Sequence, residues 1–568
     1  MNAPSNVAYQ VMWNRLISVV EEQAQALVRT AFSTSVREAG DLSAGVYNAD
    51  GLMLAQAVTG TPGHVNAMAD AVAHFIRRIG RENIFEGDVY ITNDPWEGTG
   101  HLHDFTVVTP SFFNGKMVGF FACTAHVVDV GGRGFGADGA SVYEEGIHVP
   151  IMKFAERGTV DKTLVAMLRS NVREPDQLIG DIFALSSCNE IGHRRLAEMM
   201  QEFALTDLAG IAAFILDNSR RATLERIAAL PRTSADGEMT VDGFDKPITL
   251  KVKLTIHADR IVSDFEGTSG IDKKGINCPL VYAKAYACYA LKCAIAPEIP
   301  NNAASLAPFE IAAPEDSIVN AKHPAPVALR HIVGHFVPDT VYNALDKILP
   351  DMVPAEGAGC LCNFQVSLRP RTDQTPPADA VRSEVLAFNS GGAGARPQFD
   401  GLNATAFPSG VMTMPVEATE HAGPVIIWRK ELRPDSGGAG QQRGGLGQFM
   451  EVGAREGHEF DFQAMFDRVN HPALGRRGGG SGGATTIAQD DGSKMNGKGK
   501  QFVPHGRRVM LGLPGGAGYG DAAKRPKSSV MRDLARGYIT AQTAKQDYAL
   551  SDADIATVEA AIKSGQDL

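Results

Sequence analysis

The N-terminal part of the chain carries apolar residues at helical spacing and then changes to strict alternation. Met12, Leu16 and Val20 fall on one face of a helix predicted over residues 8–32, with charged residues on the opposite face. From residue 42 to residue 55 the apolar positions alternate around a turn at residues 48–51, which predicts a β-hairpin. Helical spacing then returns and predicts a helix over residues 65–79.

A second hairpin is predicted where two apolar runs, residues 105–113 and 117–130, flank Asn114 and Gly115. If these two residues form the turn, Phe113 pairs with Lys116. Continuing that ladder places residue 103 opposite His126. The hairpin therefore returns His126 to the beginning of its first strand.

The remaining pattern predicts an α+β chain with mixed and antiparallel sheets, an N-terminal helix and a glycine-rich β C-terminal third. We expect three regions: an N-terminal region over 1–230, a middle α/β region over 231–370, and a glycine-rich β region with a helical tail over 371–568. Further predictions are helices within 160–230 and over 282–295, 330–348 and 551–562, a hairpin over 237–265, and exposed loops at 475–483 and 489–500.

Composition narrows the class of protein. With 568 residues, more than one packed subdomain is expected. We find no apolar run long enough to span a bilayer, no signal peptide and seven scattered cysteines, so the expected location is a reducing cytoplasm. A net charge of −11 argues against nucleic-acid binding. The 60 glycines mark positions of positive φ or close backbone approach.

Chemically active side chains are concentrated in residues 93–104, NDPWEGTGHLHD, immediately before a predicted strand. Three carboxylates and two imidazoles lie within these twelve residues. The second hairpin returns His126 to the start of this strand, and His101, a diagonal neighbour on the same face, also comes within reach. Two imidazoles and one carboxylate leave open positions on a divalent metal such as Zn²⁺, Mn²⁺ or Fe²⁺. The segment therefore predicts a metal site in the N-terminal region.

The spacing leaves the carboxylate ligand open. Strict alternation would put His101, His103 and His126 on one face of the sheet and Asp104 on the other, which favours His103. The glycines at positions 98 and 100 indicate an irregular loop instead, in which a three-residue offset such as that between His101 and Asp104 can converge. Both alternatives stand at this point.

Other candidates have less specific signals. Asp41 fits a further ligand, a general base or a turn-capping carboxylate. Asp129 lies close to His126 in the sequence and could orient a ligand. Asp41 and Asp129 are the candidate catalytic residues. Asp94 precedes a proline and fits a turn cap. His64 precedes a predicted helix and fits a cap better than a ligand.

The thiols and the absent motifs exclude other chemistry. Cys360 and Cys362 have one residue between them, too few for the usual zinc spacing, and are read as buried reduced cysteines. The sequence lacks a GxxxxGK[ST] phosphate loop, an HExxH helix and a GxSxG nucleophile elbow. Nucleotide chemistry, if needed, would come from another chain.

Longer motifs carry a resemblance to a known family. In chain order they are NDPWEGTGHLHDFTVVTP, AHVVDVGG, NVREPDQLIGD, PAPVALR, GARPQFDG, FPSGV, ELRPDSGGAGQQRGGLG and PGGAGYGD. Together they resemble the B-type subunit of the hydantoinase/oxoprolinase family, from about residue 30 to about residue 550.

The resemblance implies an ATP-dependent, two-subunit hydrolase of cyclic amides: hydantoins, lactams or 5-oxoproline. The implied A-type partner binds ATP and Mg²⁺ and phosphorylates the substrate, and a metal-activated water on the B-type chain opens the ring. It implies His101, Asp104 and His126 as ligands, with Asp41 as a plausible fourth. The alternatives are a subunit of an ATP-dependent ketone carboxylase, which is disfavoured by chain length, and a noncatalytic scaffold for the partner.

Overall fold

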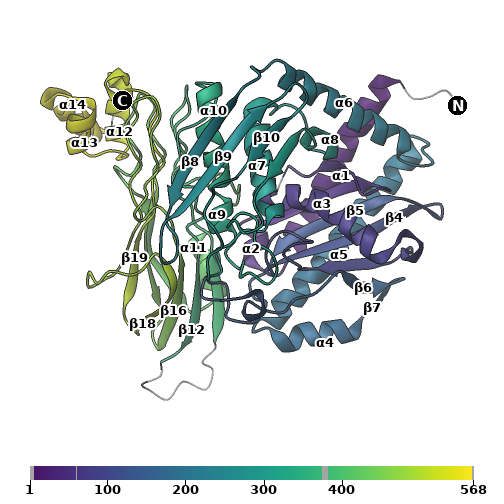
Figure 1. Cartoon of the computed structure of the whole chain (residues 1–568). Helices are drawn as coiled ribbons and strands as arrows, with labels where there is room; N and C mark the ends of the chain where they lie inside the picture. The colour runs from purple at the N-terminus through teal and green to yellow at the C-terminus, as the bar shows by residue number, and fades with distance from the viewer. Residues whose placement is uncertain (1–4, 59, 372, 374–381, 566–568) are drawn as a thin grey trace. The chain divides into compact units, whose positions relative to one another are not determined.

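The computed structural model describes residues 5–58, 60–371, 373 and 382–565. The chain forms two compact units (Figure 1). The first comprises residues 1–238 and 250–344, and the second comprises residues 239–249 and 345–568. These limits differ from the predicted boundaries at 230 and 370, because helices of the predicted middle region pack on the N-terminal region. For example, the Asn66 amide donates to the Ala285 carbonyl oxygen at 3.1 Å.

The N-terminal helix and both predicted hairpins are present in the first unit, and the predicted α+β class is confirmed. Its N-terminal elements are α1 (Asn6–Thr30), α2 (Thr34–Arg37), β1 (Leu42–Asn48), β2 (Met53–Gln56), α3 (Pro62–Ile79), β3 (Val89–Thr92), β4 (Asp104–Phe113), β5 (Lys116–His126), β6 (Met152–Glu156) and β7 (Thr159–Val160). Three helices follow, α4 (Lys162–Asn171), α5 (Pro175–Glu202) and α6 (Ala209–Ala228).

A seven-stranded antiparallel sheet in the order β2-β1-β5-β4-β3-β6-β7 forms the centre of this unit. Alternate residues of the strands point to opposite faces. On one face, Val46 and Phe121 pack against residues of α1, α5 and α6. On the other face, Tyr47 and Phe120 pack against α3. Burial on both faces explains why these strands contain so few charged residues.

The β4–β5 hairpin contains a β-bulge that corrects the predicted register. Phe113 pairs with Lys116 as expected, and Phe112 pairs with Met117, but Ser111 pairs with Gly119. Val118 is therefore an extra residue in β5, and the ladder beyond it is shifted by one. As a result Asp104, and not residue 103, lies opposite His126.

The next part of the chain forms a smaller sheet, of which residues 239–249 belong to the second unit, and further helices. The predicted hairpin over 237–265 is three strands, β8 (Ser234–Val241), β9 (Ile248–Ile256) and β10 (Ile261–Asp264), in the order β11-β10-β9-β8 with β11 (Phe309–Ala312). The predicted helix over 330–348 is interrupted. The helices here are α7 (Leu280–Ile295), α8 (Ala303–Leu306), α9 (His331–Gly334) and α10 (Val337–Ile348).

The second unit contains two four-stranded sheets, in the orders β13-β12-β16-β18 and β14-β15-β19-β17, and the predicted C-terminal helix. Its strands are β12 (Phe364–Pro370), β13 (Ser383–Ala387), β14 (Val425–Leu432), β15 (Gln448–Ala454), β16 (His458–Met465), β17 (Thr486–Gln489), β18 (Lys498–Val503) and β19 (Arg508–Gly512). Its helices are α11 (Val416–Ala422), α12 (Lys527–Ala535), α13 (Ala541–Tyr548) and α14 (Asp552–Ser564). No described helix is both long enough and apolar enough to cross a bilayer.

Glycine segments of the second unit pack backbone against backbone. The amide of Gly438 donates to the Gly516 carbonyl, and the amide of Gly516 donates to the Gly445 carbonyl, both at 2.9 Å. A β-carbon at Gly516 would lie 2.0 Å from the Ala393 carbonyl oxygen. Glycines of residues 475–483, predicted to form an exposed loop, belong to the same packing: a β-carbon at Gly479 would lie 2.1 Å from a carbonyl oxygen. At Gly516 and Gly479, close approach rather than positive φ requires glycine.

We expect Gly516→Ala to lower the free energy of unfolding by about 3 kcal/mol, because the methyl group meets backbone atoms that cannot rotate away. The control is Gly453→Ala, where the nearest atoms are side-chain atoms 3.4 Å away, and where we expect a change within about 0.5 kcal/mol. Urea denaturation of the full chain measures both. Equal denaturation midpoints for the two variants would contradict a backbone-packed glycine core.

Candidate metal centre

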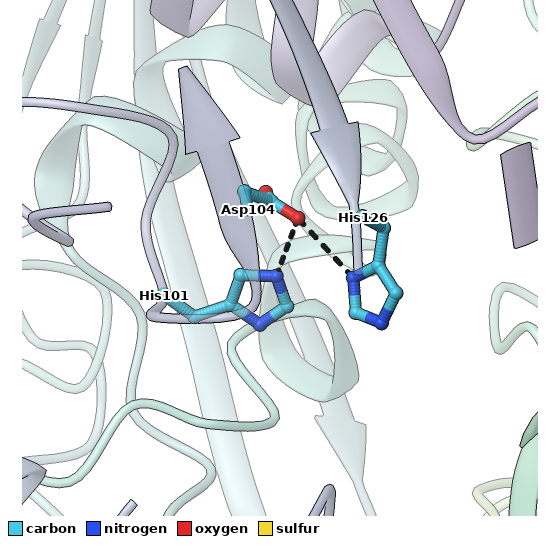
Figure 2. A group of neighbouring side chains, drawn as sticks. All are labelled: His101, Asp104 and His126. Carbon is cyan, nitrogen blue, oxygen red and sulfur yellow. Dashed lines mark hydrogen bonds and ion pairs between the residues drawn. The ribbon is translucent and has the colours of Figure 1, made fainter. Parts of the chain in front are cut away.

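Three side chains of the first unit converge on one carboxylate oxygen. Nε2 of His101 lies 2.7 Å from Oδ1 of Asp104, and Nδ1 of His126 lies 3.2 Å from the same oxygen. Figure 2 shows both imidazole rings turned toward that atom. All three side chains are buried, and their donor atoms lie within 4.8 Å of one another. Among the described residues, no other group of three or more histidine, cysteine and carboxylate side chains has this spacing.

The local backbone explains the convergence. Residues 101–103 form a turn, and β4 begins at Asp104, so alternation along the strand does not apply to His101. Because of the bulge in β5, Asp104 and His126 are directly opposite and point to the same face. Gly100 has a φ of 105° and leaves no room for a β-carbon, which would lie 2.4 Å from Cδ of Arg330. The loop before the strand thus folds back tightly and returns His101 to Asp104.

The hydrogen bonding of His101 tests whether these residues fit a cation. Its Nδ1 lies 2.8 Å from the Ala328 carbonyl oxygen, which can only accept, so the ring proton is on Nδ1. Nε2 then presents a lone pair to a carboxylate oxygen, which also only accepts. Burial, followed by the nearby Arg330, lowers the pKa of His101 to about 3, which disfavours a second ring proton. A cation between the two lone pairs removes the conflict, so the donor set fits a metal ion.

Arg330 balances the buried carboxylate from the other side. Its guanidinium donates to Oδ2 of Asp104 and, through Nε, to the Thr99 carbonyl oxygen at 2.7 Å. It also lies 4.0 Å above the ring of Tyr282. Burial alone would raise the pKa of Asp104, but Arg330, His101 and His64 outweigh it and hold this pKa well below its usual range. Asp104 is therefore ionised, and its Oδ1 faces the two imidazoles.

His64 joins two carboxylates that the sequence points to, Asp104 and Asp41. Its Nε2 lies 2.9 Å from Oδ2 of Asp104, and its Nδ1 lies 3.5 Å from Oδ1 of Asp41. Burial lowers the pKa of His64, but Asp104 and Asp41 together raise it above its usual value. The backbone confirms the proximity of Asp41, because its carbonyl accepts from the His126 amide at 3.2 Å. Asp41 thus lies at the edge of the centre.

Several positions have roles that sequence reasoning missed or assigned differently. Both Asp129 oxygens accept bonds from the segment that begins α5, with Arg173 among the donors, so Asp129 anchors that helix and is not brought to the triad. Asp94 caps its turn, as predicted. His64, for which a helix cap was favoured over a ligand, instead lies inside α3 and pairs with Asp104. Arg330 was not predicted as a neighbour of the site. Arg330 ends the motif PAPVALR, which was a usable signal.

Glu145 supports the segment that holds both His101 and Arg330. Its Oε1 accepts from the amides of Val327 and Ala328 at 2.7 and 2.9 Å. Burial raises the pKa of Glu145 to about 8. Because the Ala328 carbonyl fixes His101, the Glu145 carboxyl group orients this imidazole indirectly.

Comparisons with known proteins agree with this fold. The pattern of the family described as hydantoinase B/oxoprolinase matches residues 5–522. The chain is 26% identical over 583 residues to the B-type subunit of a putative D-/L-hydantoinase of Pseudomonas sp. (strain NS671), covering 96% of this chain and 95% of that protein.

Two solved structures share the fold. An ATP-dependent caprolactamase from Pseudomonas jessenii has a TM-score of 0.84 at 22% identity, covering 99% of this chain and all (100%) of that one. A nucleotide-free acetone carboxylase has a TM-score of 0.83 at 18% identity, covering 98% of this chain and 83% of that one. These observations define the class of protein: an α+β chain of two units with a buried centre of histidine and aspartate side chains. The chain belongs to the hydantoinase B/oxoprolinase family.

Proposed function

We propose that the chain is the B-type subunit of an ATP-dependent hydrolase of cyclic amides and that His101, Asp104 and His126 hold a divalent transition metal. The convergence of two imidazole nitrogens on one buried carboxylate oxygen carries this proposal. Nitrogen and oxygen donors suit Zn²⁺, Mn²⁺ or Fe²⁺, and three protein ligands leave open positions, as catalytic sites require. A closed structural site, which the noncatalytic scaffold alternative needs, would have four.

The protein groups around the triad have defined roles in this proposal. Arg330 engages Oδ2 of Asp104 and leaves Oδ1 directed at the ligand position. The Ala328 carbonyl keeps the proton of His101 on Nδ1, so that Nε2 is free to coordinate. Asp41 is the candidate base in this proposal, since His64 holds it next to Asp104 and its carboxylate lies outside the group of donor atoms with metal-site spacing. When bound, a divalent ion supplies Lewis acidity that lowers the pKa of a coordinated water to about 7 in favourable sites.

ATP chemistry belongs to a partner chain in this proposal. The sequence has no GxxxxGK[ST] loop, and a relative of nearly the same length is named as one subunit of a hydantoinase. An A-type subunit with ATP and Mg²⁺ would phosphorylate the amide oxygen. Phosphorylation makes a poorly electrophilic amide carbon open to attack by water.

The experiment combines the purified chain, its A-type partner and ATP with a panel of hydantoins, lactams and 5-oxoproline, and with ketones plus bicarbonate. We expect ring-opened amide products, about one divalent metal per chain by elemental analysis, and no phosphate release from ATP without the partner. Carboxylated ketones as the product would favour a ketone carboxylase. Full activity of metal-free protein in chelator would contradict the metal assignment.

A further inference from the structure

A third imidazole, that of His103, lies beside the triad without joining it. The side chain is fully buried, and neither ring nitrogen has a hydrogen-bond partner among the described residues. The ring is nearly parallel to that of His126, at 13°, with 5.5 Å between the centroids. Its nitrogens fall outside the group of donor atoms with metal-site spacing. His103 therefore borders the metal position but does not face it as a fourth ligand.

An unpaired imidazole is a poor choice if packing is its purpose. A buried polar atom without a partner keeps the full desolvation cost of its unmade hydrogen bond. An aliphatic side chain of similar size would fill the same space without that cost. Both nitrogens of His103 bear this cost next to the proposed catalytic centre. The natural explanation is that a bound molecule supplies the missing partners.

His331 is a second imidazole of this kind. It lies in α9, is buried, and has no partner for Nε2 among the described residues. The ring of Phe135 connects the two histidines, with centroid distances of 4.7 Å to His103 and 5.6 Å to His331. The same ring lies 4.9 Å from that of His126. Two imidazoles with unpaired nitrogens and one apolar ring thus adjoin the triad.

We propose that His103 and His331 bind the amide edge of the substrate and that Phe135 contacts its apolar ring atoms. His103 can offer an N–H donor and a lone pair, and His331 can offer its Nε2 as one or the other. The edge of a cyclic amide or ureide has the matching carbonyl oxygen and N–H. This inference rests on the proposed hydrolase function and names the residues that would bind the amide edge of its substrates.

The test uses His103→Leu, which keeps the volume and removes both nitrogens, and His103→Gln, which keeps one donor and one acceptor. With hydantoin, 2-pyrrolidone and 5-oxoproline as probes, binding to the metal-loaded chain and KM of the two-subunit enzyme are measured. For His103→Leu we expect a Kd and KM about tenfold higher, the factor for one lost hydrogen bond, with the metal retained. We also expect a higher Tm, since an unpaired polar group is removed. His103→Gln should recover part of the affinity, and His331→Leu should weaken it similarly.

The matched control is His193→Leu, because Nδ1 of His193 is paired with Oγ of Ser111 at 2.7 Å. That variant should lower Tm and leave Kd and KM unchanged. If wild type binds and hydrolyses a probe, and His103→Leu and His331→Leu do so equally well, this inference is wrong and the hydrolase stands. Loss of metal from His103→Leu would make His103 a ligand and also overturn it. A wild-type chain that neither binds nor hydrolyses any probe overturns the proposed function together with this inference.

Discussion

The His126→Ala variant is expected to lose its divalent metal and to turn over at least about a thousandfold more slowly, because a bound ion supplies several kcal/mol of charge stabilisation. Nδ1 of His126 is one of the two nitrogens that face Oδ1 of Asp104. The substitution leaves the contact between Asp104 and Arg330 intact, so we expect folding and partner assembly to persist. Metal content by elemental analysis and ring opening by the two-subunit enzyme measure the result.

His103→Ala is the matched control, since it removes a neighbouring buried imidazole that lies outside the group of donor atoms. It should retain the metal. If His103→Ala lost the metal and His126→Ala kept it, the ligand assignment would be wrong. A His126→Ala chain that fails to assemble with its partner, without a change in any catalytic step, would instead favour the noncatalytic scaffold.

Arg330→Ala is expected to lower the free energy of unfolding by about 3–5 kcal/mol, the usual cost of leaving one member of a buried ion pair alone. Arg330 is 2% exposed and Asp104 is 1% exposed, so water cannot replace the lost guanidinium. The substitution also removes the donor to Thr99 and the contact with Tyr282. Asp104→Ala should cause a comparable loss for the same reason, besides losing the metal.

Urea denaturation of Arg330→Ala is best compared with that of Arg195→Ala. Arg195 forms an ion pair with Glu22 at 2.6 Å, but both side chains are more than 40% exposed, so we expect at most about 1 kcal/mol. Arg330→Lys should restore part of the stability, because lysine returns the positive charge. The restoration should be partial because lysine lacks the planar guanidinium group that donates several hydrogen bonds at once. A denaturation midpoint for Arg330→Ala equal to that of Arg195→Ala would show that the pair between Arg330 and Asp104 contributes little.

Local signals in the sequence were sufficient for the elements that carry the site. The turn at Asn114 and Gly115 determines the β4–β5 hairpin because a two-residue turn joins strands that are already adjacent in the chain. The same locality explains why α1, α3 and α7 were predicted within a few residues of their ends. The density of imidazoles and carboxylates in residues 93–104 also identified the candidate centre, and the long motifs identified the family.

The register of that hairpin and the surroundings of the centre depend on tertiary structure. No residue type near Val118 marks the bulge in the sequence. The bulge nevertheless shifts every pair beyond it by one residue and places Asp104 opposite His126. Arg330 comes from a segment more than 200 residues away in the sequence, and its effect on Asp104 exists only after the chain has folded. The glycines of the second unit also depend on tertiary structure. The sequence shows only that these positions have no side chain, and the folded chain places carbonyl groups of distant segments in the space that a side chain would occupy. Turns and periodicities are properties of neighbouring residues, whereas register shifts, buried ion pairs and backbone packing are settled by residues that meet only in the folded protein.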